Sequence, residues 1–263
     1  MKKLFFAGLM SLGALVMISC LEGGSNVRTQ NGIPGIVRFD MKNMKTVISS
    51  PEFGAANFYD PQFETQGFTD GDCILFGYTV DLSDDVNLDY ATTGLLHGSV
   101  SGPVLVNQYP CYSYMLRDTA VLIDGEQPVA YAVSENGYNF YYSDKWFMSS
   151  DFRQYTGQET NWLLYYDGEL PTETVEGKEA YTLFVRAVLT KEGTAPIIEG
   201  TMLNTFNASN FFDGIQSREK SKGKTEAYFR ICYIKEIKED GSFTWEHSNL
   251  LYNTIFETET DPA

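Results

Sequence analysis

Short apolar runs, broken repeatedly by turn-forming residues, are the feature that most restricts the fold of this chain. The runs are rich in Val, Ile, Thr, Tyr and Phe, and Gly, Asp, Asn, Pro and Ser separate them. In residues 181–189 and 227–233 every second residue is apolar, so one face of an extended strand would be buried. A sustained helical period is not found after the first twenty residues. The pattern therefore predicts an all-β fold.

The expected elements are about twelve strands and one short helix at residues 210–220. The pair Asp240-Gly241 lies between Ile237 and Phe243 and is typical of a tight hairpin turn. The expected strands are residues 35–39, 45–49, 73–81, 104–107, 119–123, 129–134, 138–142, 161–166, 181–189, 197–203, 226–238 and 249–257.

The number of expected strands exceeds that of one ordinary sandwich, so we expect two small β domains in the 263 residues. Turn-forming residues gather at residues 124–128, and we place the boundary there; an alternative boundary lies near residues 143–157. The first β domain would then comprise residues 32–126 and the second residues 127–263.

The N-terminus has the order of a secretory signal. A basic start with Lys2 and Lys3 is followed by an uncharged apolar stretch that is too short to span a membrane comfortably. The stretch ends at Ser19-Cys20, which resembles the lipobox of bacterial lipoproteins, although Met17 stands where that family usually has Leu. The resemblance implies a signal peptide at residues 1–19 and acyl chains on Cys20. The alternative is a plain secretory signal or a poor transmembrane helix.

Residues 20–31 are expected to form a lipidated tether, because the residues after Cys20 are polar and rich in glycine. The formal net charge is −16, which disfavours nucleic acid and anionic headgroups as partners. We therefore expect attachment to the membrane through the acyl chains on Cys20. The expected location is the cell envelope, at the outer membrane, on either its periplasmic face or the cell surface.

Residues 44–81 resemble the first domain of the NigD-like lipoproteins of Bacteroidota. An Asp70-Gly71 pair precedes the apolar run 73–79, which ends in Tyr78-Thr79. In those proteins the first domain is OB-like and the second is a β-sandwich, so the resemblance implies an OB-like or barrel-like first domain here. It transfers no catalytic residue, because the family has no settled activity.

Groups for catalysis and metal binding are scarce. His97 and His247 lie far apart in the sequence, and Val100 stands where a nucleophile elbow requires serine. We therefore expect a protein that is not an enzyme and that holds no cofactor or metal. Two possibilities stay open. One is a chance pair of carboxylates at the spacing of a glycosidase. The other is Ca²⁺ binding by the acidic residues 81–89, which otherwise form a solvated loop.

Three further cysteines, Cys73, Cys111 and Cys232, allow at most one disulfide between them. Cys73 and Cys232 lie within apolar strand patterns, where a free cysteine behaves as a small hydrophobic residue. Whether any pair of the three is bonded stays open.

Aromatic residues supply the candidate ligand site. Six of the ten residues 138–147 are aromatic, and a second cluster lies at residues 162–166. One interpretation is a platform on which sugar rings stack, and the other is the core of a sandwich. The candidate ligand-binding residues are Tyr141, Asp144, Trp146 and Trp162.

Together these features predict a lipid-anchored, non-catalytic binding or interaction module of the cell envelope, whose ligand is a glycan or a partner protein. The first alternative is a structural subunit of a surface assembly or fibre, held together by strand donation. The second is a carbohydrate-active hydrolase that uses two carboxylates.

Overall fold

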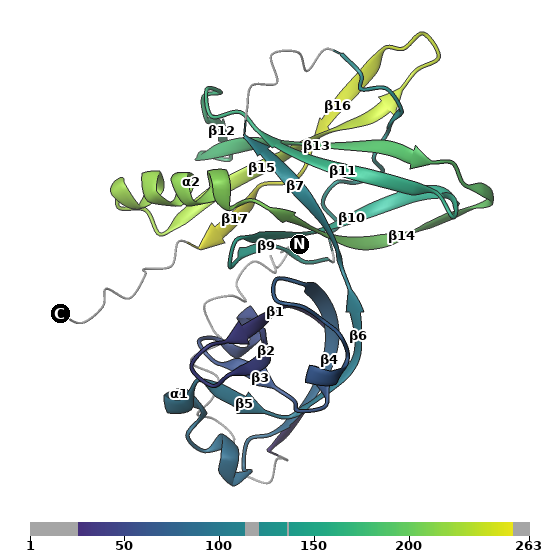
Figure 1. The fold of residues 1–263 in the computed structure, drawn as a ribbon. Coiled ribbons are helices and arrows are strands. Elements are labelled where there is room, and N and C mark those ends of the chain that lie inside the picture. The colour runs from purple at the N-terminus through teal and green to yellow at the C-terminus, as the bar shows by residue number, and fades with distance from the viewer. Residues whose placement is uncertain (1–25, 114–120, 136, 255–263) are drawn as a thin grey trace, which may run out of the picture. The chain divides into compact units, whose positions relative to one another are not determined.

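The computed structural model describes residues 26–113, 121–135 and 137–254, which form two units (Figure 1). The first unit ends at Val106 and the second begins at Asn107. Both are built mainly of strands, and the described ranges contain two α-helices, of 4 and 13 residues. The predicted all-β fold is confirmed. In these ranges no helix is both long and apolar enough to cross a bilayer.

The first unit is a six-stranded sheet in the order β5-β3-β2-β1-β4-β6. Its central strand β1 is long enough to pair with β2 through its last residues and with β4 through the rest. A register shift between Gln30 and Ile33 interrupts the β1–β4 pairing, as a β-bulge does. The elements are β1 (Val27–Asp40), β2 (Lys45–Ser49), η2 (Pro51–Phe53), β3 (Asn57–Tyr59), η3 (Phe63–Thr65), β4 (Cys73–Asp81), η4 (Asp85–Asn87), α1 (Tyr90–Thr93), β5 (Leu95–His97) and β6 (Ser99–Leu105).

Aromatic rings fill the core of the first unit. Phe58 and Phe76 are fully buried, and Phe53 stacks on Phe58 with 5.0 Å between the ring centroids. Each ring of this kind removes a large apolar surface from water, which lets a domain of this size hold together. The expected strands at residues 45–49 and 73–81 match β2 and β4 residue for residue.

The second unit contains the remaining strands, and their hydrogen-bonded path runs β16-β15-β13-β11-β7-β14-β10-β9. Its one helix, α2, follows β14. The elements are β7 (Asn107–Ser113), β8 (Glu126–Gln127), β9 (Asn139–Tyr142), β10 (Lys145–Thr156), β11 (Glu159–Tyr166), β12 (Glu173–Val175), β13 (Lys178–Lys191), β14 (Thr194–Asn207), α2 (Ser209–Ser221), β15 (Glu226–Ile237), β16 (Phe243–His247) and β17 (Leu251–Thr254).

Two layers of strands make up the second unit, and the predicted β-sandwich is confirmed. One layer holds β9, β10 and β14, and the other holds β11, β13, β15 and β16 (Figure 1). Strand β7 joins them, because residues 107–110 pair with β14 and residues 111–113 pair with β11. At the opposite edge Val129 N–H donates to Ile234 O, while Tyr131 pairs with Asp151 of β10.

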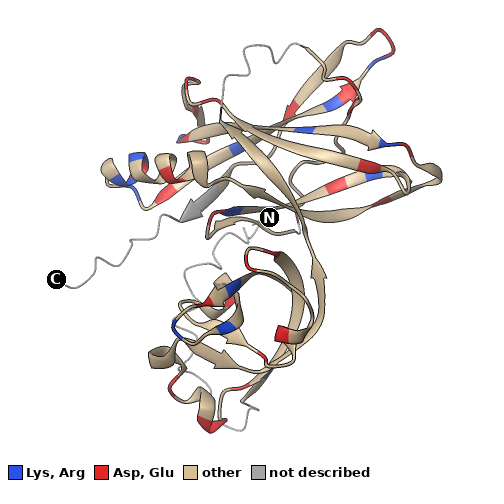
Figure 2. Ribbon diagram, in the orientation of Figure 1, with Lys and Arg blue, Asp and Glu red and all other residues tan. Residues whose placement is uncertain are grey.

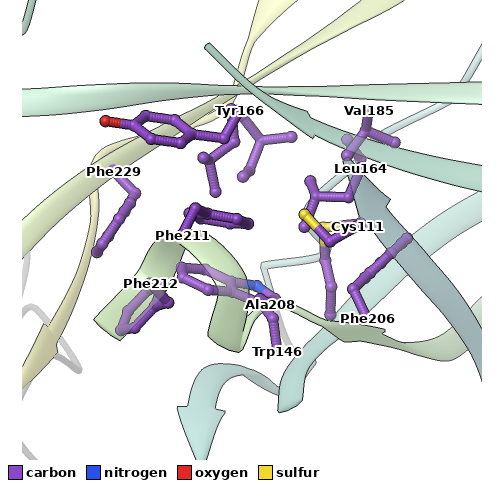
Figure 3. Packing of buried hydrophobic residues seen from close by; sticks show 14 of the residues in the cluster. Cys111, Trp146, Leu164, Tyr166, Val185, Phe206, Ala208, Phe211, Phe212 and Phe229 are labelled. Carbon is purple, nitrogen blue, oxygen red and sulfur yellow. The ribbon is translucent and has the colours of Figure 1, made fainter. Parts of the chain in front are cut away.

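Helix α2 packs against both layers. Its residues Phe211, Phe212 and Ile215 are buried and share one face of the helix, as the spacing of three to four residues requires. The ring of Phe212 contacts Tyr141 of β9 at 3.9 Å and Phe229 of β15 at 5.0 Å between centroids. Figure 3 shows these phenylalanines among the side chains of the core. The expected helix at residues 210–220 is present.

The division between the units lies earlier in the chain than the boundary expected at residues 124–128. Residues 107–113 hydrogen-bond to β11 and β14, so they belong to the sheet of the second unit. The preceding strand, β6, pairs with β4 and so belongs to the sheet of the first unit. Residues 27–31 of the expected tether lie in β1, where Val27 pairs with Asp81. The expected signal peptide and Cys20 lie outside the described residues.

Candidate ligand-binding cleft

The three aromatic residues of the predicted ligand site are buried. Trp146 is 1% exposed, Trp162 is 4% exposed and Tyr141 is 9% exposed. The ring of Trp146 packs edge-on against Phe212 and Phe229, with centroids 5.3 and 5.1 Å away. A stacking platform needs an open ring face, so the burial supports the other interpretation of the cluster, a sandwich core.

Asp144 and Tyr141 flank the turn between β9 and β10. Ser143 and Asp144 have φ values of 46° and 74°, as the two residues of a type I′ hairpin turn require. The Asp144 carboxylate lies 3.4 Å from Lys145 Nζ, and the Tyr141 hydroxyl donates to Asp213 of α2 at 3.1 Å. Burial and the neighbouring Asp213 carboxylate raise the pKa of Tyr141. These contacts stabilise the hairpin and its packing on α2.

Trp162 belongs to a different part of the second unit, where it lines a cleft. The cleft is open to solvent and is bounded by strands of both layers, near the β10–β11 and β13–β14 connections. It has a small lobe of about 180 Å³ and a large lobe of about 480 Å³. The residues shared by both lobes are Gln154, Gln158, Thr160 and Trp162.

A change along the strands from apolar to polar residues creates the cleft. On β10, alternate residues run from the fully buried Trp146 and Met148 to the half-buried Gln154. On β11 the same alternation runs from Leu164 to Thr160. Residues two apart share a face of a strand, so one end of the sandwich is filled with rings and the other end is left polar.

Uncharged polar groups dominate the large lobe. Four of its ten lining residues carry amides, and an amide offers both hydrogen-bond donors and acceptors. The four are Asn107, Gln154, Gln158 and Asn161. Thr160 and Thr190 add hydroxyl groups, while Tyr109, Trp162 and Met202 supply the apolar surface.

The charged groups at the cleft are engaged with one another or with hydroxyls. Each basic side chain lies beside a carboxylate in an exposed ion pair, whereas Asp151 keeps its negative charge because a hydroxyl does not neutralise it. The pairs are Glu159 with Lys191 at 2.6 Å, Arg153 with Glu199 at 3.1 Å, and Asp151 with the Thr201 hydroxyl at 2.6 Å.

An unpaired amide lies next to the large lobe. Asn204 of β14 is fully buried, and among the described residues neither its amide oxygen nor its nitrogen has a hydrogen-bond partner. It shares a face of β14 with Met202 and Phe206, and its partner in the β7 pairing is Asn107. Both Asn107 and Met202 line the large lobe. Buried amides are normally hydrogen-bonded, so this one has capacity for a further bond.

Tyr109 positions one wall of the large lobe. Its hydroxyl donates to the backbone oxygen of Thr160 at 3.3 Å and so links β7 to β11. Burial raises the pKa of this phenol. The hydroxyl therefore stays protonated at neutral pH and keeps its role as a donor.

Burial shifts the pKa values of Cys111, Cys232 and both histidines toward the neutral forms of these side chains. Cys73, Cys111 and Cys232 form no disulfide, and burial raises the pKa of both Cys111 and Cys232 to about 12, so these thiols stay protonated. Burial lowers the pKa of His97 in the first unit and of His247 in the second. The described ranges contain no group of three or more His, Cys, Asp or Glu that could hold a metal.

The acidic loop at residues 81–89 uses its side chains in turns. Asp81 accepts hydrogen bonds from the backbone and hydroxyl of Ser83, which lower the pKa of the carboxyl. Asp84 caps Val86, and the Asn87 amide bonds to the backbone of His97. These contacts support the solvated loop over a Ca²⁺ site.

A second charged group surrounds the end of α2, where Figure 2 shows Lys, Arg and acidic residues together. Glu219 is 1% exposed and lies 2.8 Å from Lys222 Nζ and 2.6 Å from Lys224 Nζ. Lys224 also pairs with Glu179 at 2.8 Å. The lysines thus neutralise carboxylates of their own chain, which makes this group a structural one.

Of the residues that line both lobes, only Trp162 was expected from the sequence. Amides such as Gln154 and Gln158 form no motif, and Asn107 lies distant in the chain. A polar residue at an inward position of a strand is the one available signal. Gln154 shows it, since it continues the alternation of Trp146 and Met148.

Comparison with known proteins finds a match for the first unit. Residues 24–102 match the family model described as a lipoprotein OB domain. The first unit is therefore similar to that domain, and the predicted resemblance to Bacteroidota lipoproteins is confirmed. No curated protein is significantly similar to the chain.

Similar solved structures come from the same bacterial group. An uncharacterized protein from Parabacteroides merdae has 23% identity and a TM-score of 0.71, over 87% of this chain and 100% of that chain. A candidate lipoprotein from Bacteroides fragilis has 10% identity and a TM-score of 0.56, over 88% and 100%. A NigD-like immunity protein from Bacteroides caccae has 9% identity and a TM-score of 0.46, over 86% and 93%, which is too low to carry an argument. The first two establish a shared fold.

Proposed function

We propose that this chain is a lipid-anchored protein of the outer membrane, and that its second unit is a non-catalytic binding module with the cleft as its ligand site. The observation that carries the proposal is the open, amide-lined large lobe. At about 480 Å³ it falls within the range of about 300–1,000 Å³ that is usual for ligand sites. Its lining combines amide and hydroxyl groups with apolar surface, which suits a ligand that has both polar groups and apolar faces.

The anchor supports this arrangement. The lipoprotein OB domain is consistent with acyl chains on Cys20, and β1 begins at Val27. Six residues separate the two and can span roughly 20 Å when fully extended. We therefore assign the first unit the role of a spacer close to the bilayer.

The alternatives have less support. A retaining or inverting glycosidase needs two carboxyl groups about 5–10 Å apart on either side of one bond. Asp151 lines the small lobe, Glu159 lines the large one, and both are engaged with partners. A fibre subunit that assembles by strand donation needs a terminal strand that leaves its own sheet. Strand β17 instead pairs with β15 over four residues.

Titration with soluble ligands tests the proposal. We would follow the fluorescence of the unlipidated mature chain, whose three tryptophans, Trp146, Trp162 and Trp245, all lie in the second unit. The panel comprises neutral oligosaccharides, uronic-acid oligosaccharides and short peptides. We expect at least one class to bind, and Gln154→Trp, which fills both lobes, should weaken that binding at least tenfold.

Gln108→Trp is the matched control, because Gln108 is exposed on the face of β7 opposite Asn107 and Tyr109. It should bind like the unaltered chain. The proposal fails if no class binds, or if the Gln154→Trp protein binds as well as the control.

A further inference from the structure

We infer that the ligand of the cleft is a neutral oligosaccharide whose hydroxyls bind the amides of the large lobe and reach the unpaired amide of Asn204. This inference rests on the proposed function, that the cleft binds a ligand, and it identifies the ligand's chemistry. Three independent features support it: the hydrogen-bonding character of the lining, the exposed aromatic surface, and the orphaned amide.

The lining matches hydroxyl groups. A sugar hydroxyl donates one hydrogen bond and accepts others, and an amide side chain does both, through an oxygen and a nitrogen bonded to the same carbon. The large lobe presents four such amides together with the hydroxyls of Thr160 and Thr190. An anionic ligand would instead require free Lys or Arg. Lys191 and Arg153, the basic residues near the cleft, are paired with Glu159 and Glu199.

Aromatic side chains provide apolar surface for the ring faces of a sugar. Tyr155 of the small lobe is 48% exposed, and Tyr109 of the large lobe is half-buried. Trp162 lies between them at the boundary of the two lobes, largely covered by the core. Exposed tyrosines of this kind combine an apolar face with a polar tip. Their presence in both lobes favours a chain of several sugar units over a single ring.

Asn204 is the feature that packing alone does not explain. On β14 it lies between Met202 and Phe206 on one face of the strand. An apolar residue at this position would leave no buried donor or acceptor without a hydrogen bond, as the Asn204 amide does. Leaving a buried amide unpaired is costly, and groups of this kind call for a specific explanation. Its pairing partner Asn107 lines the large lobe. Asn204 itself is fully buried and lines neither lobe, so a ligand hydroxyl bound by Asn107 engages it only when the side chains between them move aside.

The test uses neutral gluco- and manno-oligosaccharides of four to six units, in both α- and β-linked forms, against uronic-acid oligosaccharides of the same length. Affinities are measured by calorimetry and tryptophan fluorescence on the full mature chain. We expect a neutral oligosaccharide to bind and the uronic ones to bind at least tenfold more weakly. Loss of one amide, in Gln154→Leu or Asn107→Ala, should weaken binding about three- to tenfold. Gln108→Leu, the control, should not change it.

Asn204→Leu separates binding from folding. Replacing an unpaired buried amide by an apolar side chain of similar size should raise the melting temperature of the second unit. The same variant should weaken binding of the neutral oligosaccharide about three- to tenfold. A raised melting temperature with unchanged affinity would show that the ligand does not reach Asn204 and would overturn that part of the inference.

The panel also separates the two proposals. If a peptide or a uronic-acid oligosaccharide binds while neutral ones do not, and Gln154→Trp abolishes that binding, the cleft is a ligand site and the oligosaccharide inference is wrong. If no class binds, both proposals are wrong.

Discussion

Replacing Glu219 by Gln should destabilise the second unit by about 3 kcal/mol at pH 7. Burial alone would raise the pKa of this carboxyl, but hydrogen bonds from Lys222, Lys224 and Tyr181 outweigh it and lower the pKa from 4.5 to about 2. A difference of this size between the folded and unfolded chain corresponds to about 3 kcal/mol, since each pKa unit is worth about 1.4 kcal/mol. The side chain is 1% exposed, so solvent screens these contacts little.

The pH dependence has a definite sign. Because the pKa is lowered on folding, the stabilisation is complete above pH 4.5 and is lost as the pH falls toward 2. The Glu219→Gln protein has no carboxyl to titrate there. We therefore expect the difference in unfolding free energy between the two proteins to be largest at neutral pH and to shrink below pH 4.5.

Denaturant unfolding followed by tryptophan fluorescence measures this difference, because all three tryptophans lie in the second unit. A loss of about 3 kcal/mol in the unfolding free energy should lower the melting temperature of the second unit by about 6–12 °C. The control is Glu179→Gln, which removes a carboxylate that contacts the same lysines from an exposed position, where solvent screens the contacts, so its effect on stability should be much smaller. Equal stabilities of Glu219→Gln and the unaltered protein at pH 7 would refute the reasoning.

Three other predictions follow from the anchor, the core and the thiols. Cys20→Ala should move the protein from the membrane to the soluble fraction, and unchanged fractionation would exclude lipid anchoring at this residue. Trp146→Ala should destabilise the second unit by about 3–5 kcal/mol, because it leaves a ring-sized cavity in the core. A smaller loss of unfolding free energy in chemical denaturation would show that neighbouring side chains move in and fill the cavity. In the Cys20→Ala protein, the buried Cys73, Cys111 and Cys232 should react with a thiol reagent only on unfolding, whereas rapid labelling of the native protein would contradict their burial.

Much of the fold was predictable where local and tertiary preferences agree. The hairpin around Asp240-Gly241 was expected between Ile237 and Phe243, and those two residues are paired across it. A helix was expected at residues 210–220, and α2 spans Ser209–Ser221, with Phe211, Phe212 and Ile215 at helical spacing on its buried face.

Other elements depend on partners that a local pattern does not reveal. Strand β10 runs over residues 145–156, where polar residues such as Asp151 and Gln154 hide the alternation. It exists because β14 pairs with it along its length. Strand β7 was expected to belong to the first domain, yet it forms hydrogen bonds to two strands that lie far along the chain.

The candidate site likewise has features that the sequence predicts and features that depend on the tertiary structure. Residue types and short spacings were enough to predict an all-β protein, an aromatic core, and the lack of the histidine and cysteine spacing of common catalytic sites. The three-dimensional packing was needed to show that Trp146 lies in the core while Trp162 borders a cleft, and that Asn107 lies beside Asn204. Those outcomes depend on which strands pair across long stretches of chain and on α2 packing against one region of the sandwich, neither of which is encoded in local periodicity.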